Sequence, residues 1–150
     1  MIKVCIEAEA GSREKHRYDE NTLEHVGAGH VSRPYPFPYG FILGTRTADG
    51  ECVDCYLITG EPLIPGSVVE CEPIGLLEQV EDGEIDHKVL AAMPGHQIEL
   101  DKELLQKLQD FIYAVFSEFP DVTVRVGRLL PREAAVNHIQ MCQANNLPER

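Results

Sequence analysis

Three carboxylates stand within six residues in the segment 49–54, which reads DGECVD. An apolar run, residues 55–58, follows at once, so the acidic segment opens into a strand that we expect to be buried. A metal site gains from this arrangement, because a strand holds the ligands still while the loop closes round an ion. The pattern favours a site for hard divalent cations such as Mg²⁺, which bind carboxylate oxygens together with water and phosphate.

A second acidic turn, residues 81–86, precedes another strand-like run at 88–93. The carboxylates at these loop–strand junctions would repel one another without cations, and some of them would then hold protons. The alternative is a set of solvated turns that cap strands. The candidate ligands are Asp49, Asp54 and Asp86 for one shared ion, and Glu7 with Glu81 or Asp82 for further ions nearby.

Cysteine chemistry is less favoured. Cys52 and Cys55 have the spacing of a zinc knuckle, but neither Cys71 nor Cys142 has a close Cys or His partner to complete such a site. Residues three apart on a strand also face opposite sides. We therefore interpret the five cysteines as reduced core thiols.

The whole chain sets limits on partners and location. Its 150 residues suffice for one domain, 1–150, with a real core. A net charge of −12 argues against nucleic acid and anionic membranes, which bind basic patches. The sequence contains no apolar run long enough for a membrane span, and the first residues lack the features of a signal peptide. We expect a cytoplasmic protein.

The segments around the acidic turns are expected to be mostly strands. Residues 11–22 are highly charged and are interpreted as a solvated hairpin, and the proline-rich segment 27–40 is expected to stay extended outside a sheet. Pro73 or Gly75 is expected to bend one strand. The expected strands are residues 2–10, 39–43, 52–58, 67–77 and 88–93.

Only the last third of the chain has helical periodicity. Asp101 is the expected N-cap of a helix whose apolar stripe runs from residue 104 to 119 and stops at Pro120. A short strand at 122–126 follows, and Pro131 is expected in the first turn of a final helix. This order predicts an α+β fold that is mainly β.

Several motifs together resemble one known family. Residues 49–54 are similar to the D-[GSN]-D-P-[LIV]-D signature of soluble family I inorganic pyrophosphatases. Other motifs of that family resemble segments of this chain in the same order and spacing. These segments are residues 6–7 with 11–15, residues 35–42, residues 63–69 with 73–75, and residues 82–91.

The resemblance implies a five-stranded OB-like barrel with two flanking C-terminal helices, in a homo-oligomer that is a hexamer in bacterial members. It also implies hydrolysis of diphosphate to two phosphates by a water that Mg²⁺ activates, with Mn²⁺ as a substitute. The matching residues are Asp49, Asp54, Asp86, Glu7 and Glu81 as metal ligands, Lys15, Arg17 and Lys88 as substrate-binding groups, and Glu51, Tyr39 and Asp54 as catalytic groups.

Some positions depart from the family pattern. Glu51 stands where the family has an Asp that acts as the general base. Its side chain is one methylene longer, which displaces the carboxylate oxygens by on the order of 1 Å, and a displacement of that size can lower a rate roughly 10²-fold. Arg17 replaces a Glu, and the Tyr-Lys pair that clamps phosphate in the family reads Phe119-Pro120 here, so a hydroxyl and a cation are missing. Two alternatives therefore stay open: action on another phosphoanhydride, or a non-catalytic, metal-binding oligomeric protein.

Overall fold

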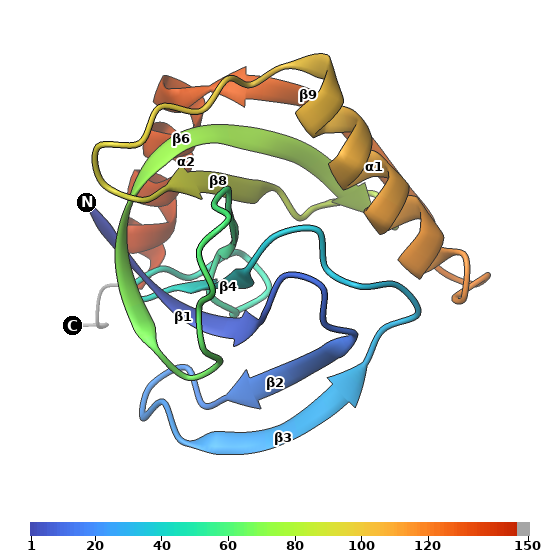
Figure 1. The fold of residues 1–150 in the computed structure, drawn as a ribbon, viewed down its shortest axis with the longest axis horizontal. Helices are drawn as coiled ribbons and strands as arrows, with labels where there is room; N and C mark the ends of the chain where they lie inside the picture. The colour runs from blue at the N-terminus through green and yellow to red at the C-terminus, as the bar shows by residue number, and fades with distance from the viewer. Residues whose placement is uncertain (147–150) are drawn as a thin grey trace.

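The computed structural model describes residues 1–146, and their central feature is a curved sheet with two helices packed against it (Figure 1). The elements in chain order are β1 (Ile2–Ala8), β2 (Glu14–Tyr18), β3 (His25–His30), β4 (Tyr39–Ile42), β5 (Asp54–Leu57), β6 (Val68–Glu81), β7 (Glu84–Ile85), β8 (Lys88–Ala92), α1 (Lys102–Phe116), β9 (Val124–Pro131) and α2 (Arg132–Asn145).

Five of these strands close into a ring through their pairing. The order is β1, β4, β5, β8 and β6, and β6 pairs again with β1. Only the β5–β8 pair is parallel. The long strand β6 has a register shift between Pro73 and Gly75, where the bend was expected. The predicted mainly β fold with a five-stranded ring and two C-terminal helices is confirmed.

The ring is tight enough to demand glycine at one position. Val4, Cys5 and Ile6 of β1 are all fully buried, so both faces of this strand pack against other parts of the protein. A Cβ atom on Gly40 of β4 would lie 1.9 Å from the carbonyl oxygen of Cys5. The two backbones approach so closely because this position carries no side chain.

Helix α1 begins as predicted but ends earlier. The side chain of Asp101 accepts a hydrogen bond from the backbone N–H of Leu104 at 2.9 Å, as an N-cap does. Leu104, Leu108 and Ile112 form its buried face. The helix ends at Phe116, so the apolar stripe overran it by three residues.

The C-terminal segment differs from its prediction at Pro131. This residue is the last of β9 and the N-cap of α2, so it precedes the first turn of the helix. The strand β9 is longer than expected because it pairs with β6 from Val124 to Pro131. The expected inner face of α2 is confirmed, since Ala135, Ile139 and Cys142 are buried.

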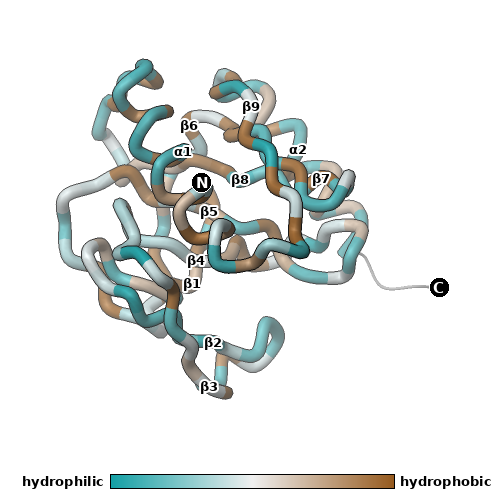
Figure 2. Tube along the Cα trace, turned by 90° about the vertical axis from the view of Figure 1, so that its right-hand side faces the viewer, coloured by the Kyte–Doolittle hydropathy of each residue, from teal (hydrophilic) through white to brown (hydrophobic). Residues whose placement is uncertain are grey.

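The hairpin β2–β3 lies outside the ring and extends away from it (Figures 1 and 2). Only the first strand of the expected hairpin lies within residues 11–22, and its second strand occupies residues 25–30. The prediction that residues 27–40 stay outside any sheet is therefore wrong for residues 27–30. The first proline of that segment is Pro34, and it does not interfere with the pairing of β3.

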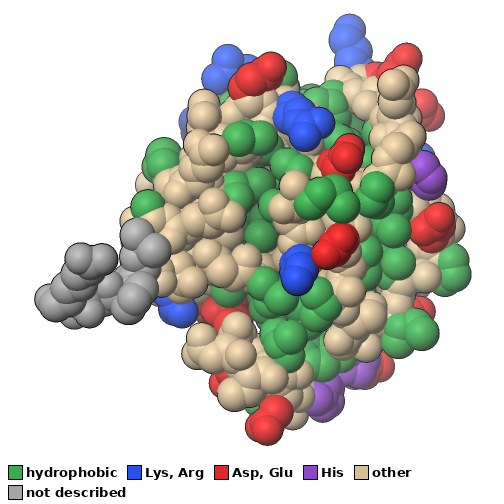
Figure 3. Space-filling model, turned by 90° about the vertical axis from the view of Figure 1, so that its left-hand side faces the viewer, with side chains coloured by type: hydrophobic (Ala, Val, Ile, Leu, Met, Phe, Trp, Pro, Cys, Tyr) green, Lys and Arg blue, Asp and Glu red, His purple; other side chains and the backbone are tan. Residues whose placement is uncertain are grey.

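Apolar side chains also reach the surface. On the face shown in Figure 3, they form several exposed patches between acidic and basic groups. Met1, Ile64 and Met141 are 68%, 72% and 64% exposed. Among residues 1–146, no helix has the length and apolar character needed to cross a membrane.

Candidate active site

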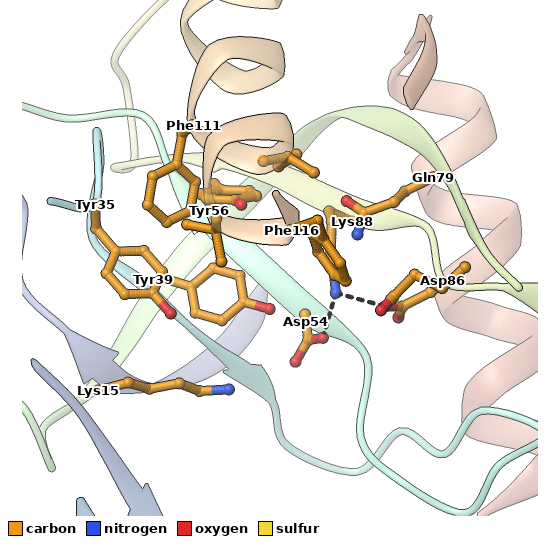
Figure 4. A pocket seen from close by; sticks show the side chains of 13 residues that line it. Lys15, Tyr35, Tyr39, Asp54, Tyr56, Gln79, Asp86, Lys88, Phe111 and Phe116 are labelled. Atoms are coloured by element: carbon orange, nitrogen blue, oxygen red, sulfur yellow. Dashed lines mark hydrogen bonds and ion pairs between the residues drawn. The ribbon is translucent and has the colours of Figure 1, made fainter. Parts of the chain in front are cut away.

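A cavity of about 230 Å³ opens between the ring of strands, the hairpin and α1 (Figure 4). Its lining combines charged groups, three tyrosines and an apolar wall. The lining residues are Lys15, Tyr35, Tyr39, Asp54, Tyr56, Gln79, Glu81, Asp86, Lys88, Phe111, Ile112, Val115 and Phe116.

An ion-paired lysine lies at the centre of this lining. Lys88 is 6% exposed, and its Nζ lies 2.6 Å from Asp54 Oδ2 and 3.0 Å from Asp86 Oδ2 (Figure 4). Burial opposes the charged form, but the two carboxylates outweigh it and raise the pKa of Lys88 above its ordinary value. The ammonium group is therefore a permanent cation between two predicted metal ligands.

Asp54 and Asp86 reach the cavity because their strands are neighbours. Asp54 is the first residue of β5, and Lys88 is the first residue of β8, which runs parallel to β5. Asp86 lies two residues before Lys88, in the turn after β7. The parallel pairing brings the starts of both strands to the same end of the ring, and with them the two acidic turns.

A second hollow adjoins the first and shares two of its carboxylates. It has a volume of about 360 Å³ and is lined by Asp49, Glu81, Asp82, Glu84, Ile85 and Asp86. Glu81 and Asp86 line both spaces. The structure thus brings four predicted ligands, Asp49, Asp54, Glu81 and Asp86, to two connected spaces.

Two glutamates in this region have pKa values well above the ordinary value of a carboxyl group. Glu7 on β1 is 7% exposed, and burial raises its pKa to about 7, against the opposing effect of Lys15. Burial also raises the pKa of Glu81, with a further contribution from the nearby Asp86 carboxylate. Crowded, half-desolvated carboxylates of this kind are what a bound cation would stabilise in the charged form.

The donor set suits a hard divalent cation, but the ligands are not assembled in advance. Among residues 1–146, no three Asp, Glu, His or Cys side chains converge closely enough to hold an ion as they stand. Asp54 and Asp86 instead share the ammonium of Lys88. The oxygen donors suit a hard divalent cation, for which Lys88 would have to move aside or share its partners.

The loop that carries Asp49 and Glu51 is braced by hydrogen bonds. Asp49 Oδ1 accepts from the Glu51 backbone N–H at 3.0 Å and from the Thr47 hydroxyl. The bond from Thr47 lowers the pKa of Asp49. Arg46 Nη1 donates to the carbonyl of Gly50 at 2.5 Å, and the Cys52 N–H donates to Glu20 in the hairpin at 3.1 Å. Hydrogen bonds thus connect the acidic loop to Arg46, which precedes it in the chain, and to Glu20 in the hairpin.

Glu51 and Arg17 stand apart from the cavity walls. The side chain of Glu51 is exposed and lines neither space, although burial and the Asp49 and Asp54 charges raise its pKa. Arg17 is exposed on β2, with its guanidinium beside Gly27 of β3. Lys15, two residues earlier on the same strand, does line the cavity. The structure therefore places Lys15 at the site and Arg17 at its periphery.

The tyrosines form one wall of the cavity. Tyr39 stacks on Tyr35 with ring centroids 5.2 Å apart and contacts Tyr56 at 4.8 Å. Burial raises the pKa of Tyr39 well above its ordinary value, so this hydroxyl keeps its proton. In Figure 4 the hydroxyl points into the cavity, and Lys15 Nζ lies 5.4 Å from the ring centroid.

Helix α1 supplies an apolar wall. Phe111, Ile112, Val115 and Phe116 line the cavity, whereas Phe119 lies beyond the helix and is 54% exposed. Neither Phe119 nor Pro120 lines the cavity, and the expectation that they replace the clamp residues of the family stays a prediction. The helix ends at Phe116, and its last turn faces the cavity.

Sequence reasoning also missed Gln79 and Tyr56 as wall residues. Tyr56 lies in an apolar run that indicated only a buried strand. Gln79 follows a register shift in β6, which changes the side to which the following side chains point. Only the pairing of that strand shows which way Gln79 faces.

Comparison with known proteins gives a consistent result. A sequence model of the family described as inorganic pyrophosphatase matches residues 4–146. The inorganic pyrophosphatase of Nanoarchaeum equitans is 30% identical over 96% of both chains. That of Aquifex pyrophilus is 43% identical, over 60% of this chain and 52% of its own length.

Solved structures agree with these matches. The crystal structure of inorganic pyrophosphatase from Thermus thermophilus has a TM-score of 0.85 and 27% identity, covering 96% of this chain and 90% of that one. The match of the family to nearly the whole chain, together with a relative that is similar over its full length, settles the relationship. The chain belongs to the inorganic pyrophosphatase family.

Proposed function

We propose that this protein hydrolyses inorganic diphosphate to two phosphates and needs Mg²⁺ to do so, with Mn²⁺ as a substitute. The observation that carries the proposal is one cavity that combines Lys15 and Lys88 with the carboxylates Asp54, Glu81 and Asp86, in a chain of this family. A purely structural cation site would need the carboxylates but not two lysines.

The size of the cavity supports a small substrate. Its volume of about 230 Å³ is below the roughly 300–1,000 Å³ of sites for drug-sized ligands. Diphosphate is a compact anion that such a space can hold. The net charge of −12 would repel it, so the positive charges that meet it must be local.

Cations held by Asp49, Asp54, Asp86, Glu7 and Glu81 would supply a Lewis acid that activates water and screens phosphate charge. The side chains of the protein then have separate tasks. Lys15 and Lys88 neutralise phosphoryl oxygens, and their charges stabilise the negative charge that builds up on the leaving phosphate.

Two further groups handle protons and orientation. Tyr39 keeps its proton and can donate a hydrogen bond into the cavity. Glu51 is the proposed proton acceptor, and it must turn toward the cavity from its exposed position on the acidic loop. Arg17, at the periphery, is the proposed first contact for the incoming anion.

Phosphate release from diphosphate tests the proposal. The wild-type protein should release phosphate with Mg²⁺ present and stop when EDTA is added. Asp54→Asn should lose most of this activity, while Glu78→Gln, in an exposed ion pair on β6, should keep it. Equal release by the wild type and Asp54→Asn would contradict the assigned site.

We also infer a cytoplasmic homo-oligomer, a hexamer by family resemblance, formed by a single domain. The five cysteines are free and buried, as in proteins of reducing compartments. Exposed apolar side chains such as Met1 and Ile64 offer surface for contacts between copies. Sedimentation equilibrium would give a mass of six chains, and a monomer at micromolar concentration would contradict the assembly.

A further inference from the structure

Gln79 is a buried polar side chain with an unused acceptor. It lies on β6, is 2% exposed and lines the cavity, and its Oε1 has no hydrogen-bond partner among the described residues. Its backbone is held by the two residues that precede β8. The N–H donates to His87 Nδ1 at 3.0 Å, and the carbonyl accepts from the Asp86 N–H at 2.9 Å. These bonds fix the backbone of Gln79 and therefore the side of β6 on which its side chain lies.

This unpaired oxygen destabilises the free protein. A buried acceptor without a partner raises the free energy of the folded state, and an apolar side chain of the same length would avoid that cost. The neighbouring wall, with Ile112 and Phe116, would accommodate methionine well. The sequence thus places an amide at a site where stability alone favours an apolar residue.

Lys88 is a donor from which this oxygen could accept a hydrogen bond. Its ammonium has three N–H groups, and two carboxylates, Asp54 and Asp86, hold it in the cation-free protein. Divalent cations on those carboxylates would repel the ammonium and take its acceptors. In Figure 4 the Gln79 side chain extends from β6 toward Lys88 with its amide nitrogen on the lysine side, so a half-turn of the terminal amide would present the oxygen to the released lysine.

We propose that Gln79 is a positioning residue: with cations and diphosphate bound, its Oε1 accepts a hydrogen bond from Lys88 Nζ and holds the ammonium against a phosphoryl oxygen. An amide suits this task because it orients the ammonium without neutralising it. A carboxylate in the same place would cancel the charge and repel the anionic substrate. The inference rests on the proposed function.

The test compares Gln79→Met with Leu77→Met. Leu77 is a fully buried residue of the same strand that does not line the cavity, so its replacement controls for methionine in β6. Gln79→Met should keep or raise the Tm while kcat/KM for diphosphate falls about tenfold, the effect of losing a hydrogen bond to a charged group. Leu77→Met should lower the Tm slightly and leave kcat/KM unchanged.

Binding of imidodiphosphate, a non-hydrolysable analogue, separates this inference from the proposed function. With Mg²⁺ present, calorimetry should show about tenfold weaker binding to Gln79→Met and wild-type affinity for Leu77→Met. A Gln79→Met protein with wild-type kcat/KM and wild-type analogue affinity would overturn the inference. So would a Tm below that of Leu77→Met, since the amide would then be structural.

Failure of the proposed function and failure of the inference about Gln79 give different results. A wild-type protein that binds the analogue but releases no phosphate from diphosphate refutes the proposed function, and the role of Gln79 is then decided by the analogue affinities. A wild-type protein that neither binds nor hydrolyses refutes both.

Discussion

Replacement of Lys88 by methionine tests whether the cavity carboxylates serve a cation. In the wild type, Lys88 Nζ neutralises Asp54 at 2.6 Å and Asp86 at 3.0 Å. Removing one partner of a buried ion pair costs about 3–5 kcal/mol. The carboxylate side chains are 26% and 30% exposed, so water compensates part of the loss and we expect about 2 kcal/mol. For a chain of this size that is a fall in Tm of about 4–8 °C.

Magnesium should reverse this loss. The freed carboxylates are a better cation site than ion-paired ones, and ligand at a hundred times its Kd stabilises by about 2.7 kcal/mol. Differential scanning calorimetry at pH 8, with EDTA or excess Mg²⁺, should therefore show a larger Mg²⁺-induced rise in Tm for Lys88→Met than for the wild type.

The matched control is Arg128→Met. Arg128 pairs with Glu78 at 2.8 Å, but its side chain is 77% exposed, so its loss should leave stability nearly unchanged, with or without Mg²⁺. An equal Mg²⁺-induced rise in Tm for Lys88→Met and wild type would show that the lysine does not compete with a cation for these carboxylates.

Burial raises the pKa of Glu7 from its ordinary value of 4.5 to about 7. The protonated side chain therefore stabilises the fold without cations, and it does so fully when the pH is below 4.5. That stability, about 3 kcal/mol, should be lost as the pH rises toward 7, so urea unfolding in EDTA should give a lower free energy of unfolding at pH 8 than at pH 5; a flat profile would contradict this. Glu51→Gln should lower kcat about 10²-fold with little change in KM if Glu51 accepts the proton, whereas a wild-type rate in initial-velocity assays would remove it from the reaction. Burial raises the pKa of Cys5 to about 11 and of Cys52 to about 12, so Ellman's reagent at pH 8 should label the native protein slowly and all five thiols in denaturant; rapid labelling of the native protein would show that the thiols are accessible.

The framework of the site could be predicted because its signals are local. Asp101 stands one turn before an apolar stripe, and the structure uses it as an N-cap. The two acidic turns each precede an apolar run, and these runs became β5 and β8. Their parallel pairing brings Asp54 and Asp86 to one cavity, as the repeated pattern suggested.

What failed depends on contacts distant in the chain. The apolar stripe continues to Phe119, but the helix ends at Phe116 and so changes which residues form the cavity wall. The Lys88–Asp54 ion pair joins residues 34 positions apart, and charge types alone do not show which groups pair when no cation is bound. The sequence pattern also does not show which way the Gln79 side chain points, because this follows from a register shift in the pairing of β6 with β9.

The proposed reaction is cleavage of diphosphate in this cavity with the help of a divalent cation. Phosphorus NMR tests it most directly, because diphosphate and phosphate give separate signals in one sample. With Mg²⁺ and catalytic amounts of protein, the diphosphate signal should disappear while the phosphate signal grows at two phosphates per diphosphate, and EDTA should stop the change. A diphosphate signal that stays constant with Mg²⁺ and with Mn²⁺ would show that the protein does not hydrolyse diphosphate.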